Sequence, residues 1–266
     1  MKSLVVACGL LMLVPATAGA ELKFTMRTEL QKSAAAPTPA PNPLLTMMGE
    51  AMTRQVLPEG NATMTYLIGE KGTRVEFVNA AMGQAAGTVS LIQPDGTAVI
   101  INPKDQTYWK MAMPAAGAAL EAAGIKPAVE TAPTGEVETV AGAKCERSTF
   151  TMKVDLPIPE AARKSLGTDF PSSIDIAGDT CATTDQFQSY AAAASRTQAT
   201  GLLAAMGLGN IGQGGIVLRQ TLRLGGVELR SVVTEIAEQP DAPELFEIPS
   251  GYKEVPAPAP APAPAR

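Results

Sequence analysis

Alternation of apolar and polar residues dominates the chain. The first clear stretch places Leu22, Phe24 and Met26 between the polar residues Lys23 and Thr25, and it continues to residue 30. A period of two predicts a β-strand with one dry and one wet face. Similar patterns predict further strands at 63–68, 73–78, 88–93, 97–102, 107–111, 137–140, 144–154, 216–224 and 227–236.

The links between these predicted strands are mostly short. Residues 69–72 and 94–96 are rich in glycine and turn-forming residues, which is typical of hairpin loops. Because short links join antiparallel neighbours, the sequence predicts a large antiparallel sheet.

Four segments have helical patterns, at 43–56, 115–123, 159–166 and 184–206. Asp185 stands near the start of the last segment and Gly207 follows its end. We therefore expect an α+β fold in which β structure dominates: a curved antiparallel sheet, apolar on one face, with a few helices covering that face.

The N-terminus reads as an export signal. Lys2 precedes an apolar run from Leu4 to Val14, and the small residues Ala18-Gly19-Ala20 follow it. This pattern predicts a signal peptide over 1–20, cleaved after Ala20, and a periplasmic or secreted protein of a bacterium. An uncleaved anchor and a lipoprotein modified at Cys8 are the alternatives. No second apolar stretch is long enough to span a membrane, so we expect no transmembrane span after cleavage.

Two cysteines remain after that cleavage, Cys145 and Cys181. An even pair in an exported protein most simply forms one disulfide. A redox or metal-binding pair is the alternative, although the chain has neither a CxxC motif nor a histidine to support it.

Proline and alanine mark the domain limits. Residues 34–43 form a Pro/Ala-rich loop, and 256–266 form a Pro-Ala tail that favours extended polyproline II structure over a packed core. We expect a single domain over 21–255 and a disordered tail after it, either inert or a spacer.

Composition narrows the function. The 266 residues include no histidine, which excludes Ser-His-Asp catalysis and histidine metal sites. A net charge of −5 argues against nucleic acid as a partner. No group of residues has the spacing of a catalytic or metal site, so we predict no enzyme activity, no metal and no cofactor.

Two stretches resemble a known family. The hairpin PDGTAVIINPKDQTYWKM and the closing element with Phe246, Pro249, Gly251 and Tyr252 resemble the domain of unknown function 4412. That family is similar in outline to the periplasmic lipoprotein carriers, whose fold is a half-open antiparallel barrel capped by helices. The resemblance implies this fold and a cysteine pair, and it supplies no catalytic residues.

The feature with most bearing on function is apolar. Met48 and Met52 lie in the predicted helix 43–56, and methionine suits adaptable apolar surfaces. If this helix covers the concave side of the sheet, an apolar cleft would be lined by Phe24, Met26, Met48, Met52, Tyr66, Trp109, Phe150 and Leu222. The alternative is that these side chains fill the core.

The resulting hypothesis is a non-enzymatic exported protein that binds a lipid or a lipoprotein in this cleft. One alternative is a structural or envelope-interaction module without a cavity. A second alternative is a hydrolase that works through serine or carboxylate chemistry without histidine.

Overall fold

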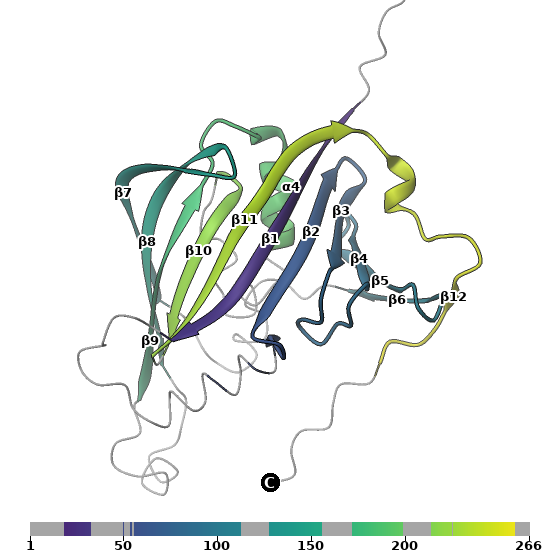
Figure 1. Ribbon diagram of the computed structural model, residues 1–266, viewed down its shortest axis with the longest axis horizontal. Coiled ribbons are helices and arrows are strands. Elements are labelled where there is room, and N and C mark those ends of the chain that lie inside the picture. The colour runs from purple at the N-terminus through teal and green to yellow at the C-terminus, as the bar shows by residue number, and fades with distance from the viewer. Residues whose placement is uncertain are drawn as a thin grey trace, which may run out of the picture.

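The computed structural model describes residues 19–32, 50, 54, 56–112, 128–155, 172–198, 214–224 and 226–258. Within these residues, one twelve-stranded sheet makes up most of the molecule (Figure 1). Its first six strands are β1 (Ala20–Lys32), β2 (Asn61–Gly69), β3 (Gly72–Phe77), β4 (Val89–Ile92), β5 (Thr97–Asn102) and β6 (Thr107–Ala112). The other six are β7 (Ala128–Val140), β8 (Ala143–Asp155), β9 (Ser173–Ala182), β10 (Val217–Leu224), β11 (Val227–Pro240) and β12 (Lys253–Glu254).

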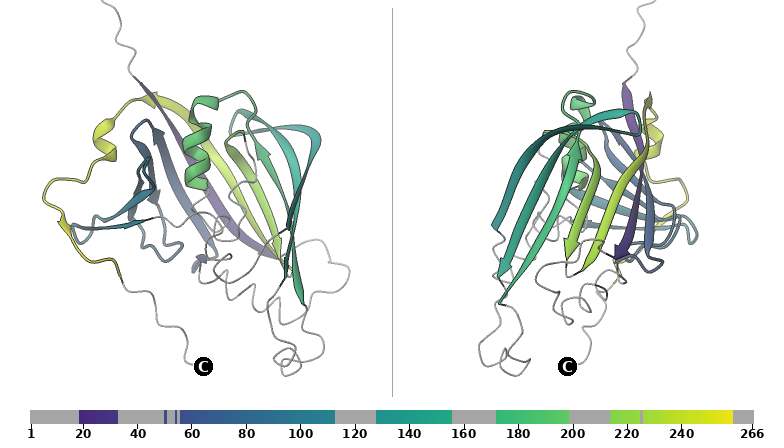
Figure 2. Two further views of the ribbon diagram at one scale, coloured as in Figure 1. Left: turned by 180° about the vertical axis from the view of Figure 1, so that it is seen from behind. Right: turned by 60° about the vertical axis from the view of Figure 1, so that its left-hand side comes forward.

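The strand order is β12-β6-β5-β4-β3-β2-β1-β11-β10-β9-β8-β7. All neighbours are antiparallel except β12 and β6, which pair in parallel. The sheet curves without closing, so β7 and β12 lie at its two ends (Figure 2). The predicted large, curved antiparallel sheet is therefore confirmed.

Most predicted strands are present with bounds shifted by one or two residues, and β11 extends four residues further. Three differences are larger. Strand β7 covers thirteen residues where the sequence predicts four, and neither β9 nor the two-residue β12 was predicted. Nearly every residue of β7 is exposed, and an edge strand without a buried face has no alternation to detect.

The prediction that a few helices cover the sheet is not supported. Among the described residues, α4 (Gln188–Gln198) is the one α-helix described over its length, and it begins four residues after the predicted start. Glu50, Arg54 and Val56, within the predicted helix 43–56, are also helical. The 3₁₀ helix η1 (Pro243–Phe246) is a single turn. The predicted helices 115–123 and 159–166, and most of 43–56, lie outside the described residues.

Helix α4 defines the two faces of the sheet. Tyr190 and Ala194 of α4 pack against Leu22, Phe24 and Ile68, and the sheet curves around the helix (Figure 2). We call this side the inner face. Because side chains alternate along β1, Lys23 and Arg27 point to the opposite, outer face.

The prediction that the sheet is apolar on one face only is wrong at β4 and β5. Val89, Leu91, Val99 and Ile101 are buried on the outer face, where Ile248 and Tyr252 pack over them. We call residues 241–255 the C-terminal strap. Its end runs along β6, where the Lys253 N–H donates to the Gln106 carbonyl and the Val255 N–H to the Tyr108 carbonyl. The closing element with Gly251 and Tyr252, noted in the sequence, is therefore the part of the strap that covers β4 and β5 on the outer face.

The predicted disulfide between Cys145 and Cys181 is present. It joins the neighbouring strands β8 and β9, and its Cα atoms are 5.2 Å apart. Both cysteines are buried beside Ile216 and Leu218. The crosslink therefore lies within the packed core.

Candidate functional site: the inner face of the sheet

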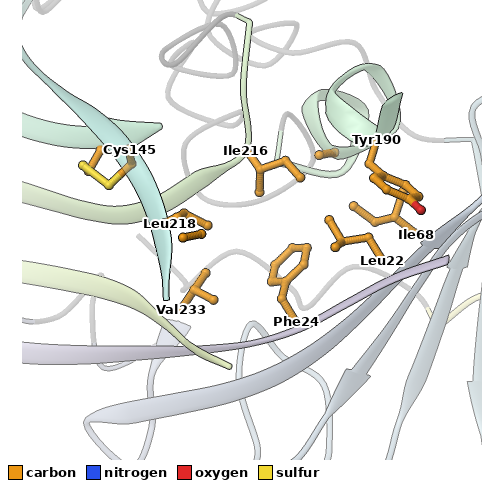
Figure 3. Close-up of a cluster of buried hydrophobic side chains, with 11 residues drawn as sticks. Leu22, Phe24, Ile68, Cys145, Tyr190, Ile216, Leu218 and Val233 are labelled. Atoms are coloured by element: carbon orange, nitrogen blue, oxygen red, sulfur yellow. A yellow bond between two sulfur atoms is a disulfide. The ribbon is translucent and has the colours of Figure 1, made fainter. Parts of the chain in front are cut away.

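The inner face is apolar because neighbouring strands place apolar side chains at paired positions on the same side of the sheet. Leu22 pairs with Ile68, Phe24 with Tyr66 and Met26 with Met64 across β1 and β2. The rings of Phe24 and Tyr66 stack with centroids 4.7 Å apart and an angle of 9° between their planes. Figure 3 shows Leu22, Phe24, Ile68 and Tyr190 gathered beneath α4, with Val233, Leu218 and Ile216 continuing towards the disulfide.

The structure divides the predicted site residues between separate places on this face. Phe24 belongs to the cluster under α4, and Met26 and Tyr66 pack against that cluster. Phe150 and Leu222 belong to a second cluster with Met152, Val154 and Ile176 on β8 and β9. Met48 and Met52 lie outside the described residues.

Trp109 is distant from both clusters. It lies on β6, five strands from β1 in the sheet order. A row of paired inner-face residues leads to it from Phe24 through Tyr66, Val75, Ser90 and Ile100. The predicted residues therefore share a face without forming a single lining.

Exposure separates core residues from residues that can meet another molecule. Phe24 and Phe150 are each 2% exposed, and Leu222 is also buried. Met26, Tyr66 and Trp109 are half-buried, and Met111 beyond Trp109 is 42% exposed.

Tyr66 is the main ionisable group in this apolar row. Its hydroxyl donates to the sulfur of Met64 over 3.6 Å, a weak acceptor. Burial raises the pKa of Tyr66 from 10.0 to about 12, because the phenolate would lose its hydration.

This pKa predicts a loss of stability in alkali. The unfolded chain releases the Tyr66 proton near pH 10 and the folded chain only near 12, so the free energy of unfolding falls as the pH rises between these values. The loss attributable to Tyr66 should reach about 2 kcal/mol. Urea unfolding at pH 9 and pH 12 measures it, and Tyr66→Phe should remove that part of the difference. An equal loss in both proteins would contradict this.

The outer face carries charges that pair with one another. Six basic residues lie on it by register: Lys23, Arg27, Arg74, Arg219, Arg223 and Arg230. Asp179 is 3% exposed and contacts Arg147, Arg219 and Arg223 at 3.7, 3.2 and 3.3 Å. Glu136, Glu138 and Glu228 pair with the same arginines. Sequence analysis missed Asp179, since β9 itself was not recognised.

Glu21 is a second buried carboxyl with a structural role. It is fully buried, and its Oε1 accepts the Ala242 N–H over 2.9 Å. Burial, and to a lesser extent the neighbouring Asp241 carboxyl, raises the pKa of Glu21. This contact attaches the start of the C-terminal strap to β1.

Among the described residues, no group of three or more histidine, cysteine or acidic residues is arranged to hold a metal ion. None of the helices in that part of the chain is both long and apolar enough to cross a membrane.

Comparison with known proteins places the chain in a family. No curated protein sequence matches it significantly. A family model matches residues 48–252, about three quarters of the chain, including the strand pairs from β2 to β6 and most of the strap. The chain belongs to the family of the domain of unknown function DUF4412.

Proposed function

We propose that this is an exported, non-enzymatic protein that binds an apolar ligand, such as the acyl chains of a lipid or lipoprotein, on the inner face of its sheet. The observation that carries the proposal is the set of half-buried apolar side chains, Met26, Tyr66 and Trp109, on the inner face of an unclosed sheet. Ligand sites are typically concave and lined mainly by apolar and aromatic side chains, with a few polar groups that orient the ligand.

Export is supported by two independent features. The first twenty residues have the pattern of a cleaved signal peptide, and the Cys145–Cys181 disulfide suits an oxidising compartment such as the periplasm. The similarity in outline to the lipoprotein carriers agrees with both.

Trp109 offers a direct test because it is the only tryptophan. Binding of the apolar fluorophore N-phenyl-1-naphthylamine to the inner face should quench its emission by energy transfer and enhance the probe's own fluorescence. Met26→Lys places a charge on the inner face and should weaken probe binding at least tenfold, since desolvating an unpaired charge costs more than about 1.4 kcal/mol.

Gln31→Lys is the matched control, because Gln31 is exposed on the same strand but faces outward. Equal binding by wild type and both variants would place the probe elsewhere. No binding by the wild type, together with no lipid in an organic extract of protein purified from the periplasm, would favour a structural module over a carrier.

A further inference from the structure

A line of uncharged polar residues crosses the apolar inner face. Ser148 pairs with Thr180, Thr180 with Gln220, Gln220 with Ser231 and Ser231 with Thr28, each on the next strand from β8 to β1. We call these five residues the polar stripe. Gln220 shares the side of β10 that carries Leu222, and Thr28 the side of β1 that carries Met26, so the stripe faces inward.

Apolar rows flank the stripe on both sides. On one side, Phe150, Leu222 and Leu229 occupy the neighbouring inner-face positions of β8, β10 and β11. On the other side, Val233 pairs with Met26. The stripe is therefore a narrow polar band within a hydrocarbon surface, and none of its five side chains is ionisable.

One donor group of the stripe, the side-chain amide nitrogen of Gln220, lacks a hydrogen-bond partner in the described part of the chain. Thr28 and Ser231 share one between their hydroxyl oxygens over 2.9 Å. The Gln220 side chain lies beside them, 9% of the residue is exposed, and its buried Nε2 has no hydrogen-bond partner among the described residues. A buried amide nitrogen carries two donors, and leaving them unpaired is destabilising.

We propose that the polar stripe recognises the uncharged carbonyl of a ligand whose remainder is hydrocarbon, as in an acyl ester, with the Gln220 amide donating to the carbonyl oxygen. This inference rests on the proposed function and specifies its ligand. The oxygen must be an acceptor because Nε2 only donates. The group must be uncharged because a buried carboxylate or phosphate would find no cation on the stripe.

The test compares three probes on the intact, exported protein: methyl oleate as the ester, oleic acid at pH 8 as the charged acid, and 1-octadecene as the hydrocarbon. Competition with N-phenyl-1-naphthylamine ranks their affinities. We expect the wild type to bind methyl oleate about tenfold more tightly than octadecene, which one well-placed hydrogen bond in a buried site can supply. Oleate should bind more weakly than methyl oleate.

Gln220→Met keeps the side-chain length and removes the donor. The variant should lose the preference for the ester and retain affinity for the hydrocarbon. Its thermal unfolding midpoint without ligand should rise by about 2–4 °C, because the unpaired amide is gone. Gln31→Met, the same change on the outer face, should alter neither property.

The outcomes distinguish failure of the stripe assignment from failure of the proposed function. If octadecene and methyl oleate bind equally to wild type and variant, or if oleate binds best, the assignment of the stripe is wrong while apolar binding stands. If none of the three probes binds, the proposed function itself fails. A lower unfolding midpoint in Gln220→Met would show that the amide is satisfied within the protein, and it would also overturn the assignment.

Discussion

Gly178→Val is expected to lower the free energy of unfolding by about 3 kcal/mol, the upper end of the usual cost of overpacking a core. A Cβ atom at residue 178 would lie 2.1 Å from the backbone oxygen of Thr221 on β10 and 2.5 Å from Cζ of Phe150 on β8. Neither atom can move aside easily, since one is backbone and the other belongs to a ring that is 2% exposed.

The ring of Phe150 occupies the space that the glycine leaves. Phe150 pairs with Gly178, which pairs in turn with Leu222, so the ring fills the inner-face position between the two strands. Urea unfolding should show the loss for Gly178→Val and a much smaller change for Ala177→Val, whose side chain points to the outer face. In a Phe150→Leu background, part of the cost should disappear. Equal stability of the two valine variants would contradict this account.

This packing explains why β9 escaped prediction. Ile174 and Ile176 begin an inward-facing apolar series, but Gly178 and Thr180 follow at the next inner positions. The apolar bulk at that point comes from Phe150 on the neighbouring strand, so the alternation in β9 itself is broken. The residue pattern of one strand does not show that a side chain from another strand fills its inner-face position.

Strands β4 and β5 differ from β9, because their positions were predicted but the residues that cover them were not. Residues 89–92 and 98–101 are buried without interruption. The strand positions were correctly predicted, but the expectation of a single apolar face did not anticipate burial on both faces, which the continuous apolar run 98–101 favours. The cover on the outer face comes from Ile248 and Tyr252, about 150 residues later in the chain, and local patterns do not reveal such a distant partner.

The inner-face residues were predictable as a class but not as a site. Alternation in β1 and β2 correctly places Phe24, Met26 and Tyr66 on one face. It does not reveal that Phe24 is core while Met26 and Tyr66 are half-buried, because exposure depends on α4 and on neighbouring strands. Gln220 was overlooked for the same reason: its significance comes from Thr28, Ser231 and Thr180 on three other strands.

Asp179→Ala is expected to cost about 3 kcal/mol, the loss typical of removing one partner from a buried ion pair. Asp179 is the buried centre of the outer-face charges, and its carboxylate contacts three guanidinium groups. Removing it leaves Arg147, Arg219 and Arg223 facing one another, and Nε atoms of Arg147 and Arg219 are already buried without a hydrogen-bond partner in the described structure. Their mutual repulsion then opposes folding.

Salt distinguishes this electrostatic cost from a packing defect. Repulsion among partly exposed arginines is screened at high ionic strength, so the destabilisation should shrink between 0.05 M and 1 M NaCl, whereas a cavity would be insensitive to this screening. Asp175→Ala on the same strand and face is the control, because Asp175 is exposed, and its effect should stay within about 0.5 kcal/mol. A salt-independent loss at Asp179, or a loss no larger than that at Asp175, would show that the three arginines do not depend on this carboxylate.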